Sequence, residues 1–253
     1  MIKVIMHGCN GKMGQVITGI IAEDADVEIV AGVDASNHIQ NTYPVFSNIA
    51  DCNVEADVVI DFCAAAAVDG LLNYCVEKKL PCVLCTTGLS EAQIAAVEEA
   101  SKKTAILRSA NMSLGVNMLL KILKEAAGIL APAGFDIEIV EKHHNQKLDA
   151  PSGTAIMLAN AINEVKDNRY HYVYDRHARR MKREKNEIGM HAIRGGTIVG
   201  EHDVIFAGND EVITLSHSAA SKTVFAEGAV NAAVFLSGKP AGLYDMKQLI
   251  EQS

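Results

Sequence analysis

The stretch IKVIMHGCNGKMGQVITGII, residues 2–21, decides the fold of this chain. Residues 2–7 form a short apolar run, which is typical of a buried strand in a parallel sheet. Gly8, Gly11 and Gly14 follow with the spacing GxxGxxG, and apolar residues at helical spacing come next. A strand, a glycine loop and a helix in this order predict a dinucleotide-binding unit, in which the loop backbone approaches a pyrophosphate at a helix N-terminus.

An acidic residue strengthens this prediction. The run VEIVAGV at 27–33 is typical of a second strand, and Asp34 follows it, 34 − 14 = 20 residues after Gly14. A carboxylate at about this distance accepts a hydrogen bond from the ribose 2′-hydroxyl. It also repels a 2′-phosphate, and no arginine follows in Ala35-Ser36-Asn37, so we expect NADH to be favoured. Lys12 can neutralise a phosphate, so NADPH is expected to bind as well. The alternative is a glycine loop that serves helix packing alone.

Strand-like and helix-like segments alternate up to residue 112, which predicts a parallel sheet covered by helices. A long amphipathic helix at 113–130 and an alternating strand at 135–144 then change the pattern, and 208–210 forms the turn of an antiparallel hairpin. We therefore expect an α/β protein with an N-terminal Rossmann-like parallel sheet and a second α+β domain with a mixed or antiparallel sheet. The predicted domains are a dinucleotide-binding domain at 1–112, onto which 224–253 packs back, and a substrate-binding and oligomerisation domain at 113–223.

Composition excludes several classes of protein. No apolar run reaches the length of about 18 residues that a membrane helix needs, and Met1 leads straight into a strand without a signal segment. We expect a cytoplasmic protein that binds no membrane. The net charge of −8 argues against a nucleic-acid partner, because phosphate contacts need a basic surface. The run at 176–185, RHARRMKREK, is basic; we interpret it as an exposed loop or helix face, with an anion-binding or subunit-contact surface as the alternative.

All six cysteines lie in the first third of the chain, and Cys82 and Cys85 form a CxxC. A redox CxxC needs a helix N-terminus to stabilise its thiolate, whereas this one lies in an apolar run that is typical of a buried strand. We expect buried free thiols.

The fifteen residues EKHHNQKLDAPSGTA, 141–155, predict an anion site where a strand runs into a helix. His143 and His144 are neighbours on a strand, so their side chains should diverge and serve different roles. One suits proton transfer, while the other, with Lys147, suits carboxylate binding. The turn at 152–154 offers backbone amides and hydroxyls, and Pro151 suits a first helical turn. The alternatives are an ordinary polar connection or a zinc site; no HxxxH or HExxH spacing supports zinc, so we expect no metal.

These residues closely resemble the 4-hydroxy-tetrahydrodipicolinate reductase (dihydrodipicolinate reductase) family of the bacterial diaminopimelate–lysine pathway. The resemblance runs nearly end to end. The segments that carry it are GCNGKMG (8–14), CTTG (85–88), SANMSLGVN (109–117), the stretch 141–155, GxxxGEH (196–202) and the helix start SKTVFAEGAV.

The resemblance implies roles for individual residues. His143 would be the catalytic proton donor or acceptor and Lys147 the second donor, with a further role for Lys147 in substrate binding. His144, Ser152, Gly153 and Thr154 would bind substrate carboxylate. On the cofactor side, Gly8, Cys9, Asn10, Gly11, Lys12 and Met13 would contact the pyrophosphate, Asp34 the ribose, and Cys85, Thr86, Thr87, Ser109, Ala110, Asn111, Met112, Lys222 and Phe225 the remainder of an NAD(P)H molecule.

The resemblance also implies the reaction and the assembly. Hydride would pass from NADH to a ring carbon of a cyclic dicarboxylate, beta to an imine, in a homotetramer joined through the second domain's sheet. Lys12, Cys85 and Lys222 depart from the family's usual residues on the cofactor side, which leaves the choice between NADH and NADPH open. The rival interpretations are another Rossmann dehydrogenase, such as an aspartate dehydrogenase-like enzyme, and a non-catalytic NAD(P)H sensor.

Overall fold

The computed structural model describes residues 1–36, 38–177 and 179–252. The chain divides into two compact units, one made of Met1–Leu114 with Thr223–Ser253 and the other of Gly115–Lys222. The roles expected for these units, dinucleotide binding and substrate binding, stay predictions. No helix in the described part of the chain is long and apolar enough to cross a membrane.

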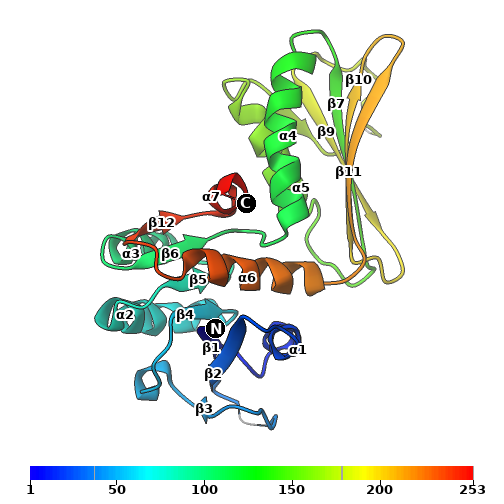
Figure 1. The fold of residues 1–253 in the computed structure, drawn as a ribbon. Coiled ribbons are helices and arrows are strands. Elements are labelled where there is room, and N and C mark those ends of the chain that lie inside the picture. The colour runs from blue at the N-terminus through cyan, green and yellow to red at the C-terminus, as the bar shows by residue number, and fades with distance from the viewer. Residues whose placement is uncertain (37, 178, 253) are drawn as a thin grey trace. The chain divides into compact units, whose positions relative to one another are not determined.

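The first unit is built on a seven-stranded sheet in the order β12-β6-β5-β4-β1-β2-β3 (Figure 1). All strand pairs of this sheet in the described part of the chain are parallel, which confirms the predicted Rossmann-like sheet. The chain order reverses between β1 and β4, so this point of the sheet is where a dinucleotide is expected to lie. The strands are β1 (Ile2–His7), β2 (Val27–Val33), β3 (Val45–Phe46), β4 (Val58–Asp61), β5 (Cys82–Leu84), β6 (Ala105–Arg108) and β12 (Gly242–Tyr244).

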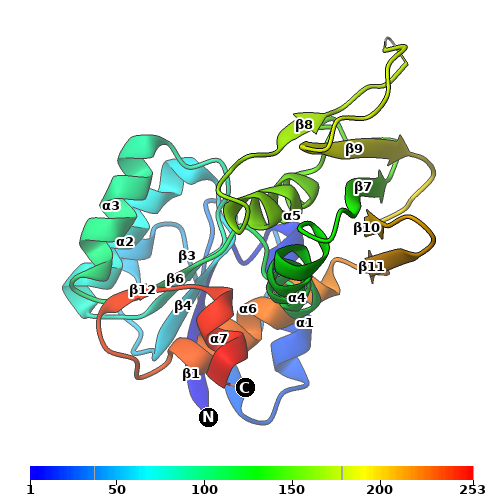
Figure 2. The same ribbon diagram turned by 90° about the horizontal axis from the view of Figure 1, so that it is seen from above.

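Helices cover both faces of this sheet because its strands are apolar on both sides. In β1, Val4 and Met6 pack with α1, α6 and α7, whereas Ile5 packs with α2 and α3. Figure 2 shows these two groups of helices on opposite sides of the sheet. All three side chains are fully buried. The helices are α1 (Lys12–Ala22), α2 (Val68–Lys78), α3 (Glu91–Ser101), α6 (Thr223–Leu236) and α7 (Met246–Gln252), with 3-10 turns at Ile49–Asp51 and Ala65–Ala67.

Two sequence signals explain how these helices are placed. Ser90 and Gln93 form the predicted capping box at the start of α3. In α6, a Cβ on Gly228 would lie 1.8 Å from the Met112 carbonyl oxygen, so the helix reaches this segment only because residue 228 is glycine. The small residues of α6 thus bring it against the segment that follows β6.

The second unit contains a five-stranded sheet in the order β11-β10-β7-β9-β8, with α4 and α5 on one face (Figure 1). The sheet is mixed, because β10 is antiparallel to β7 and β11, while β7, β9 and β8 are parallel. The predicted hairpin is confirmed at 208–211, where the Gly208 amide donates to the Glu211 carbonyl over 2.8 Å. The elements are α4 (Leu114–Leu130), β7 (Asp136–His143), α5 (Gly153–Glu164), β8 (His171–Val173), β9 (Glu187–Arg194), β10 (Gly200–Ala207) and β11 (Val212–Ala219).

The helix-covered face of this sheet changes from apolar to polar along β7. Burial alternates strictly along the strand, and Ile137 and Ile139 pack with the fully buried Leu123 and Phe206. The next two positions on the same face are Glu141 and His143, which are also buried. A buried carboxylate and imidazole in line with a hydrophobic core need polar partners, and this is where the candidate site lies.

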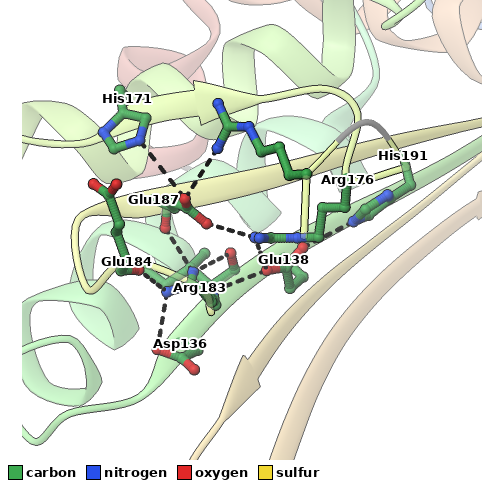
Figure 3. Close-up of polar contacts among 10 residues, drawn as sticks. Asp136, Glu138, His171, Arg176, Arg183, Glu184, Glu187 and His191 are labelled. Atoms are coloured by element: carbon green, nitrogen blue, oxygen red, sulfur yellow. Dashed lines mark hydrogen bonds and ion pairs between the residues drawn. The ribbon is translucent and has the colours of Figure 1, made fainter. Parts of the chain in front are cut away.

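The basic run at 176–185 lies between β8 and β9 as a loop, and most of its described residues are exposed, as expected. Arg176 and Arg183 form ion pairs with carboxylates on β7 and β9 (Figure 3). Arg179 also pairs with a carboxylate of β9, and Ala178 lies outside the described residues. Glu187 is buried, and its oxygens lie 2.7 Å from Arg176 Nη2 and 3.3 Å from Arg179 Nη1. These three arginines neutralise carboxylates of the sheet, a role that the sequence did not predict.

Candidate active site

The glycine loop after β1 lines a cavity of about 520 Å³ at the carboxyl ends of β1, β2 and β4. Gly8 has φ +86°, and a Cβ there would lie 2.8 Å from the Phe62 carbonyl oxygen. A Cβ on Gly14 would lie 2.2 Å from the Gly8 carbonyl oxygen. Both positions therefore require glycine, and the backbone they create is a cradle at the start of α1 that fits a pyrophosphate.

Asp34 lies in this cavity wall directly after β2. Its Oδ2 accepts from the Asn10 amide at 3.0 Å and its Oδ1 from the Ser36 amide at 2.8 Å. An ionised carboxylate has about four acceptor positions, so Asp34 is held in place and keeps capacity for ribose hydroxyls. Lys12 is exposed as the first residue of α1. Asn37, which the sequence analysis names among the residues after Asp34, lies outside the described residues.

Cys9 and Asn10 use their side chains inside the first unit. Cys9 is fully buried and its thiol occupies the space that a Cβ on Gly32 would need. The Asn10 side chain bonds to Asn41 and to the Ser36 carbonyl. Their expected contacts with a cofactor are therefore restricted to backbone groups, and the Asn10 amide is already bonded to Asp34.

The residues expected on the nicotinamide side follow the ends of β5 and β6. The Thr86 hydroxyl lies 2.5 Å from Asp61 Oδ2, and Asp61 Oδ1 lies 2.7 Å from His7 Nδ1. All three side chains are buried, and sequence analysis assigned no role to His7 or Asp61. After β6, the Ser109 hydroxyl donates to the Asn111 carbonyl over 2.8 Å, which shapes the turn. The remaining expected residues, Cys85, Thr87, Ala110 and Met112, lie in the same two segments.

The C-terminal residues expected at the cofactor fall in different units. Phe225 packs in the core of the first unit, and Lys222 is an exposed residue at the end of the second.

Six free cysteines lie in the first unit, as expected, and five of them are buried. Burial, followed by the charge of Asp61, raises the pKa of Cys63 to about 12 and raises that of Cys85 well above its usual value. Hydrogen bonding to Cys75 and burial likewise raise the pKa of Cys82. Since a reactive CxxC needs a thiolate, these shifts argue against a redox pair.

In the second unit, Glu141 joins His143, Arg194 and the start of α5. Arg194 Nη1 and Nη2 donate to its two oxygens over 2.8 and 2.7 Å, and His143 Nδ1 lies 2.6 Å from Oε2. The Ser152 amide donates to Oε1 over 3.0 Å. Burial alone would raise the pKa of Glu141, but the hydrogen bonds from Arg194, His143 and Ser152 lower it below its usual value. Glu141 is therefore an ionised carboxylate at neutral pH.

His202 completes the buried polar cluster. Its ring meets that of His143 edge-on, with centroids 5.2 Å apart, and its Nε2 lies 2.9 Å from the Ser152 hydroxyl. Burial, followed by repulsion from His143, lowers the pKa of His202 to about 4. His202 is thus neutral at neutral pH, and sequence analysis gave it no role although it closes the GEH motif.

Ser152 does not offer the free groups that the sequence predicts. Its amide is bonded to Glu141, and its hydroxyl accepts from the Ala155 amide as the N-cap of α5. It supports the site from within the fold. Helix α5 begins at Gly153, two residues after Pro151, where the sequence predicts its first turn. Gly153 and Thr154 are therefore its first two residues.

Lys147 and His144 lie in the turn after β7. Lys147 Nζ lies 2.8 Å from Asp149 Oδ1, and this contact lowers the pKa of Asp149. His143 is buried and His144 is half-buried, in line with the predicted divergence of their side chains. The structure thus places a buried imidazole, a half-buried imidazole and an ammonium group within five consecutive residues at one strand end.

Sequence comparison identifies the family of this chain. The family sequence model described as "Dihydrodipicolinate reductase, N-terminus" matches residues 2–112, and the one described as "Dihydrodipicolinate reductase, C-terminus" matches residues 115–250. The chain belongs to the dihydrodipicolinate reductase family. It is an oxidoreductase of this family, as the sequence resemblance implied.

Relatives of the family match along their whole length. The protein named 4-hydroxy-tetrahydrodipicolinate reductase from Caldanaerobacter subterraneus subsp. tengcongensis is 55% identical over 252 residues, which cover 100% of this chain and 99% of the relative. The one from Clostridium tetani is 51% identical, covering 97% and 96%. The dipicolinate-bound dihydrodipicolinate reductase from Paenisporosarcina sp. TG-14 has a TM-score of 0.82 at 25% identity, covering 97% of each chain. Its fold matches the predicted combination of a Rossmann-like sheet and a second mixed sheet.

Proposed function

We propose that this protein catalyses the NAD(P)H-dependent reduction of 4-hydroxy-tetrahydrodipicolinate to tetrahydrodipicolinate, a step of diaminopimelate and lysine biosynthesis. The observation that carries the proposal is full-length identity of 55% and 51% to proteins named for this activity. The chain keeps both parts that such a reaction needs, a glycine cradle for a dinucleotide and a histidine–lysine site for an anionic substrate.

We assign the nicotinamide cofactor to the cavity of the first unit. When bound, it supplies the hydride. The backbone at Gly8, Gly11 and Lys12 holds the pyrophosphate, and Asp34 accepts from the adenosine ribose hydroxyls. Because Asp34 is a fixed carboxylate, it disfavours a 2′-phosphate, and we propose that NADH is preferred. The segments 85–87 and 109–112 line the nicotinamide side.

We assign the substrate carboxylates to the second unit. Lys147 and His144 offer positive charge and hydrogen bonds in the turn after β7, and Gly153 and Thr154 lie at the N-terminus of α5, which favours anions. The dicarboxylate class is supported by the structural relative, which holds dipicolinate. Substrate binding then requires Lys147 to exchange Asp149 for a substrate carboxylate.

His143 is the proposed proton donor or acceptor, with Lys147 as the second donor. The imidazole is held at Nδ1 by Glu141, so it has a defined orientation before substrate arrives. Reduction of a conjugated imine moves electron density onto the ring system, and a proton must reach the substrate to complete the step. A preorganised imidazole supplies it without reorganisation of solvent.

The proposed assembly is a homotetramer joined through the sheet of the second unit. The edge strand β11 leaves Val212 64% and Ile213 36% exposed, and Ile193 on β9 is 47% exposed. An exposed apolar edge is typical of a surface that pairs with another chain. Sedimentation velocity measures the assembly directly. The cytoplasmic location expected from the sequence stays a prediction.

The decisive experiment follows oxidation of NADH and of NADPH with freshly made substrate. We expect substrate-dependent oxidation with both cofactors and a higher kcat/KM with NADH. His143→Gln is expected to lower kcat by about 100-fold or more with little change in NADH affinity, because it removes the proton-transfer group alone. Binding of NADH without substrate-dependent oxidation would favour the sensor interpretation, and turnover of an amino acid instead would favour another dehydrogenase.

A further inference from the structure

We propose that Glu141, clamped by Arg194, is a positioning residue that fixes the His143 imidazole with its proton on Nδ1 and presents Nε2 as the proton-exchanging atom. This inference rests on the proposed function, in which His143 exchanges a proton with the substrate. No motif in the sequence assigns a role to Arg194, which lies 53 residues from Glu141 along the chain.

Glu141 is fully occupied by the protein. Its Oε1 accepts from the Ser152 amide and Arg194 Nη2, and its Oε2 from His143 and Arg194 Nη1. These four contacts fill about the four acceptor positions that a carboxylate offers. The residue is 1% exposed, so it has neither the capacity nor the access to touch a substrate. Any effect of Glu141 on the reaction must therefore pass through its neighbours.

The carboxylate decides which ring nitrogen of His143 carries the proton. An ionised carboxylate is an acceptor only, so the nitrogen that lies 2.6 Å from it, Nδ1, must be the donor. In the neutral ring Nε2 is then the free acceptor, and in the charged ring it is the donor toward substrate. In both states Nδ1 keeps its contact with Glu141, so the pair supports both states of a proton-transfer cycle.

Arg194 keeps this arrangement rigid. Its bidentate contact fixes the plane of the carboxylate, and Arg194 also donates to the Asp149 carbonyl over 2.7 Å. It lies opposite His143 in the register of β7 and β9. The Arg194 guanidinium thus fixes the Glu141 carboxylate, and this carboxylate fixes the His143 ring.

The other ionisable groups around His143 are consistent with this role. His202 on β10 meets the His143 ring edge-on, and Arg194 on β9 lies opposite His143 in the strand register. His217 on β11 is the register partner of His202, and Lys147 and Asp149 lie in the turn after β7. Burial lowers the pKa of His202 to about 4 and also lowers that of His217, so neither adds a positive charge at neutral pH. Glu141 is therefore the ionised group in direct contact with the imidazole.

A purely structural role for Glu141 is the alternative, because its contact with the Ser152 amide also ties α5 to β7. The two roles differ in what they affect. A structural tie changes the free energy of unfolding, whereas a positioning residue also changes the tautomer of His143 and lowers kcat with little change in KM.

The first test needs no substrate. Long-range proton–nitrogen NMR of histidine-labelled wild-type protein reports which ring nitrogen is protonated, and the His143→Gln spectrum assigns the His143 signal. We expect His143 in the Nδ1–H form at neutral pH. A predominant Nε2–H form would overturn the proposal. This result stands whether or not the protein reduces the proposed substrate, so it separates the two proposals.

The second test compares Glu141→Gln with Lys142→Met. Lys142 is the adjacent strand residue on the other face, where it pairs with Glu201 and Asp203. Gln presents an amide in place of a carboxylate, so either tautomer of His143 can bond to it. We expect kcat to fall by about 10- to 100-fold, the typical cost of losing a group that orients a ligand or catalytic side chain. The substrate KM should change by less than about threefold.

The tautomer gives the sharper readout. Because the Gln amide can accept from Nδ1 or donate to it, we expect the NMR spectrum of Glu141→Gln to show the Nε2–H form of His143 beside the Nδ1–H form, and that of Lys142→Met to show the Nδ1–H form as in the wild type. An unchanged tautomer and an unchanged kcat in a folded Glu141→Gln variant would refute the positioning role. If that variant does not fold, Arg194→Lys decides in the same assay, with a smaller fall in kcat expected because a point charge replaces the bidentate fork.

Discussion

Gly200 on β10 lies directly beneath the imidazole of His143 on β7: a Cβ built on Gly200 would be 3.1 Å from His143 Nε2. This separation is shorter than an ordinary van der Waals contact. The absence of a side chain at residue 200 is therefore what allows the ring to lie where Glu141 holds it. The glycine of the GEH motif thus leaves room for a histidine on the neighbouring strand. The sequence of β10 alone does not indicate this role.

Gly200→Ala should reduce turnover while leaving the protein folded. The added methyl group pushes the ring by a few tenths of an ångström, and reaction rates depend steeply on such displacements, with about 100-fold for about 1 Å. We expect kcat to fall by about three- to tenfold and cofactor affinity to stay unchanged. Gly128→Ala is the matched control, because nothing lies within 4 Å of a Cβ in that helix position. Equal kcat for the two variants would show that the ring has free space.

The ion pair between Lys147 and Asp149 separates two roles of the lysine. Lys147→Ala should lower both kcat and substrate affinity, because the ammonium is proposed to bind a carboxylate and to donate a proton. Asp149→Asn removes the competing carboxylate at 2.8 Å, and that side chain is more than half exposed, so little stability should be lost. We expect the substrate KM to fall by about two- to fivefold in Asp149→Asn. A higher KM there would indicate that Asp149 orients Lys147 for the substrate.

Asp34→Asn tests the assignment of the ribose site. An amide removes the negative charge that opposes a 2′-phosphate but still offers an oxygen to the Asn10 amide. We expect the ratio of kcat/KM for NADPH to that for NADH to rise by about tenfold, mostly through KM for the cofactor. Lys12→Ala is the companion variant, and it should weaken both cofactors if this exposed lysine neutralises a phosphate. An unchanged ratio in Asp34→Asn would place the ribose elsewhere.

The parts of the fold that the sequence predicts are those with a local physical cause. The turn to α1 needs glycine at residues 8 and 14, because a Cβ at either position would overlap a backbone oxygen. Both positions lie within the same seven residues of the chain. The capping box at Ser90 and the hairpin turn at 208–211 are equally local. Each of these signals uses backbone geometry that neighbouring residues decide.

Strand β9 shows where this reasoning fails. Its first four residues, Glu187 to Met190, are all buried, so no alternation marks it as a strand. The partners of the site are similarly distant: Glu141 meets Arg194, and Ser152 meets His202, which is 50 residues away. Sequence analysis identified His143 and Lys147 because they are close together, but it could not find groups that only the register of the sheet brings to them. Two signals were available: the polar residue Glu141 at a core-facing position of β7, and His202 at the end of the GEH motif.

His202 predicts how the stability of the second unit depends on pH. Its pKa is about 4 in the folded protein, lowered chiefly by burial, against an ordinary value of 6.5. Between these values the unfolded state binds more protons than the folded state. The contribution of neutral His202 to the free energy of unfolding is therefore complete above pH 6.5 and decreases as the pH drops toward 4. The loss amounts to about 3 kcal/mol over this range. His202→Gln should flatten this part of a urea-unfolding series. The carboxylates Glu138, Glu141 and Glu187, whose pKa values are lowered, act at still lower pH, below their ordinary 4.5.

Arg183 binds the basic run at 176–185 to the sheet of the second unit (Figure 3). Its Nε and Nη1 donate to Glu138 and Asp136 over 3.0 and 2.9 Å, and its Nη2 donates to two backbone carbonyls. Arg183→Ala leaves Glu138 with fewer hydrogen-bond donors, so we expect the free energy of unfolding to fall by about 1–3 kcal/mol. We also expect faster proteolysis between residues 174 and 186. Arg180→Ala, an exposed position in the same run, is the control and should change neither. Because the cluster lies at the start of β7 and His143 at its end, kcat should be unaffected in both variants. Proteolysis of Arg183→Ala at the wild-type rate would mean that the remaining arginines hold the segment alone.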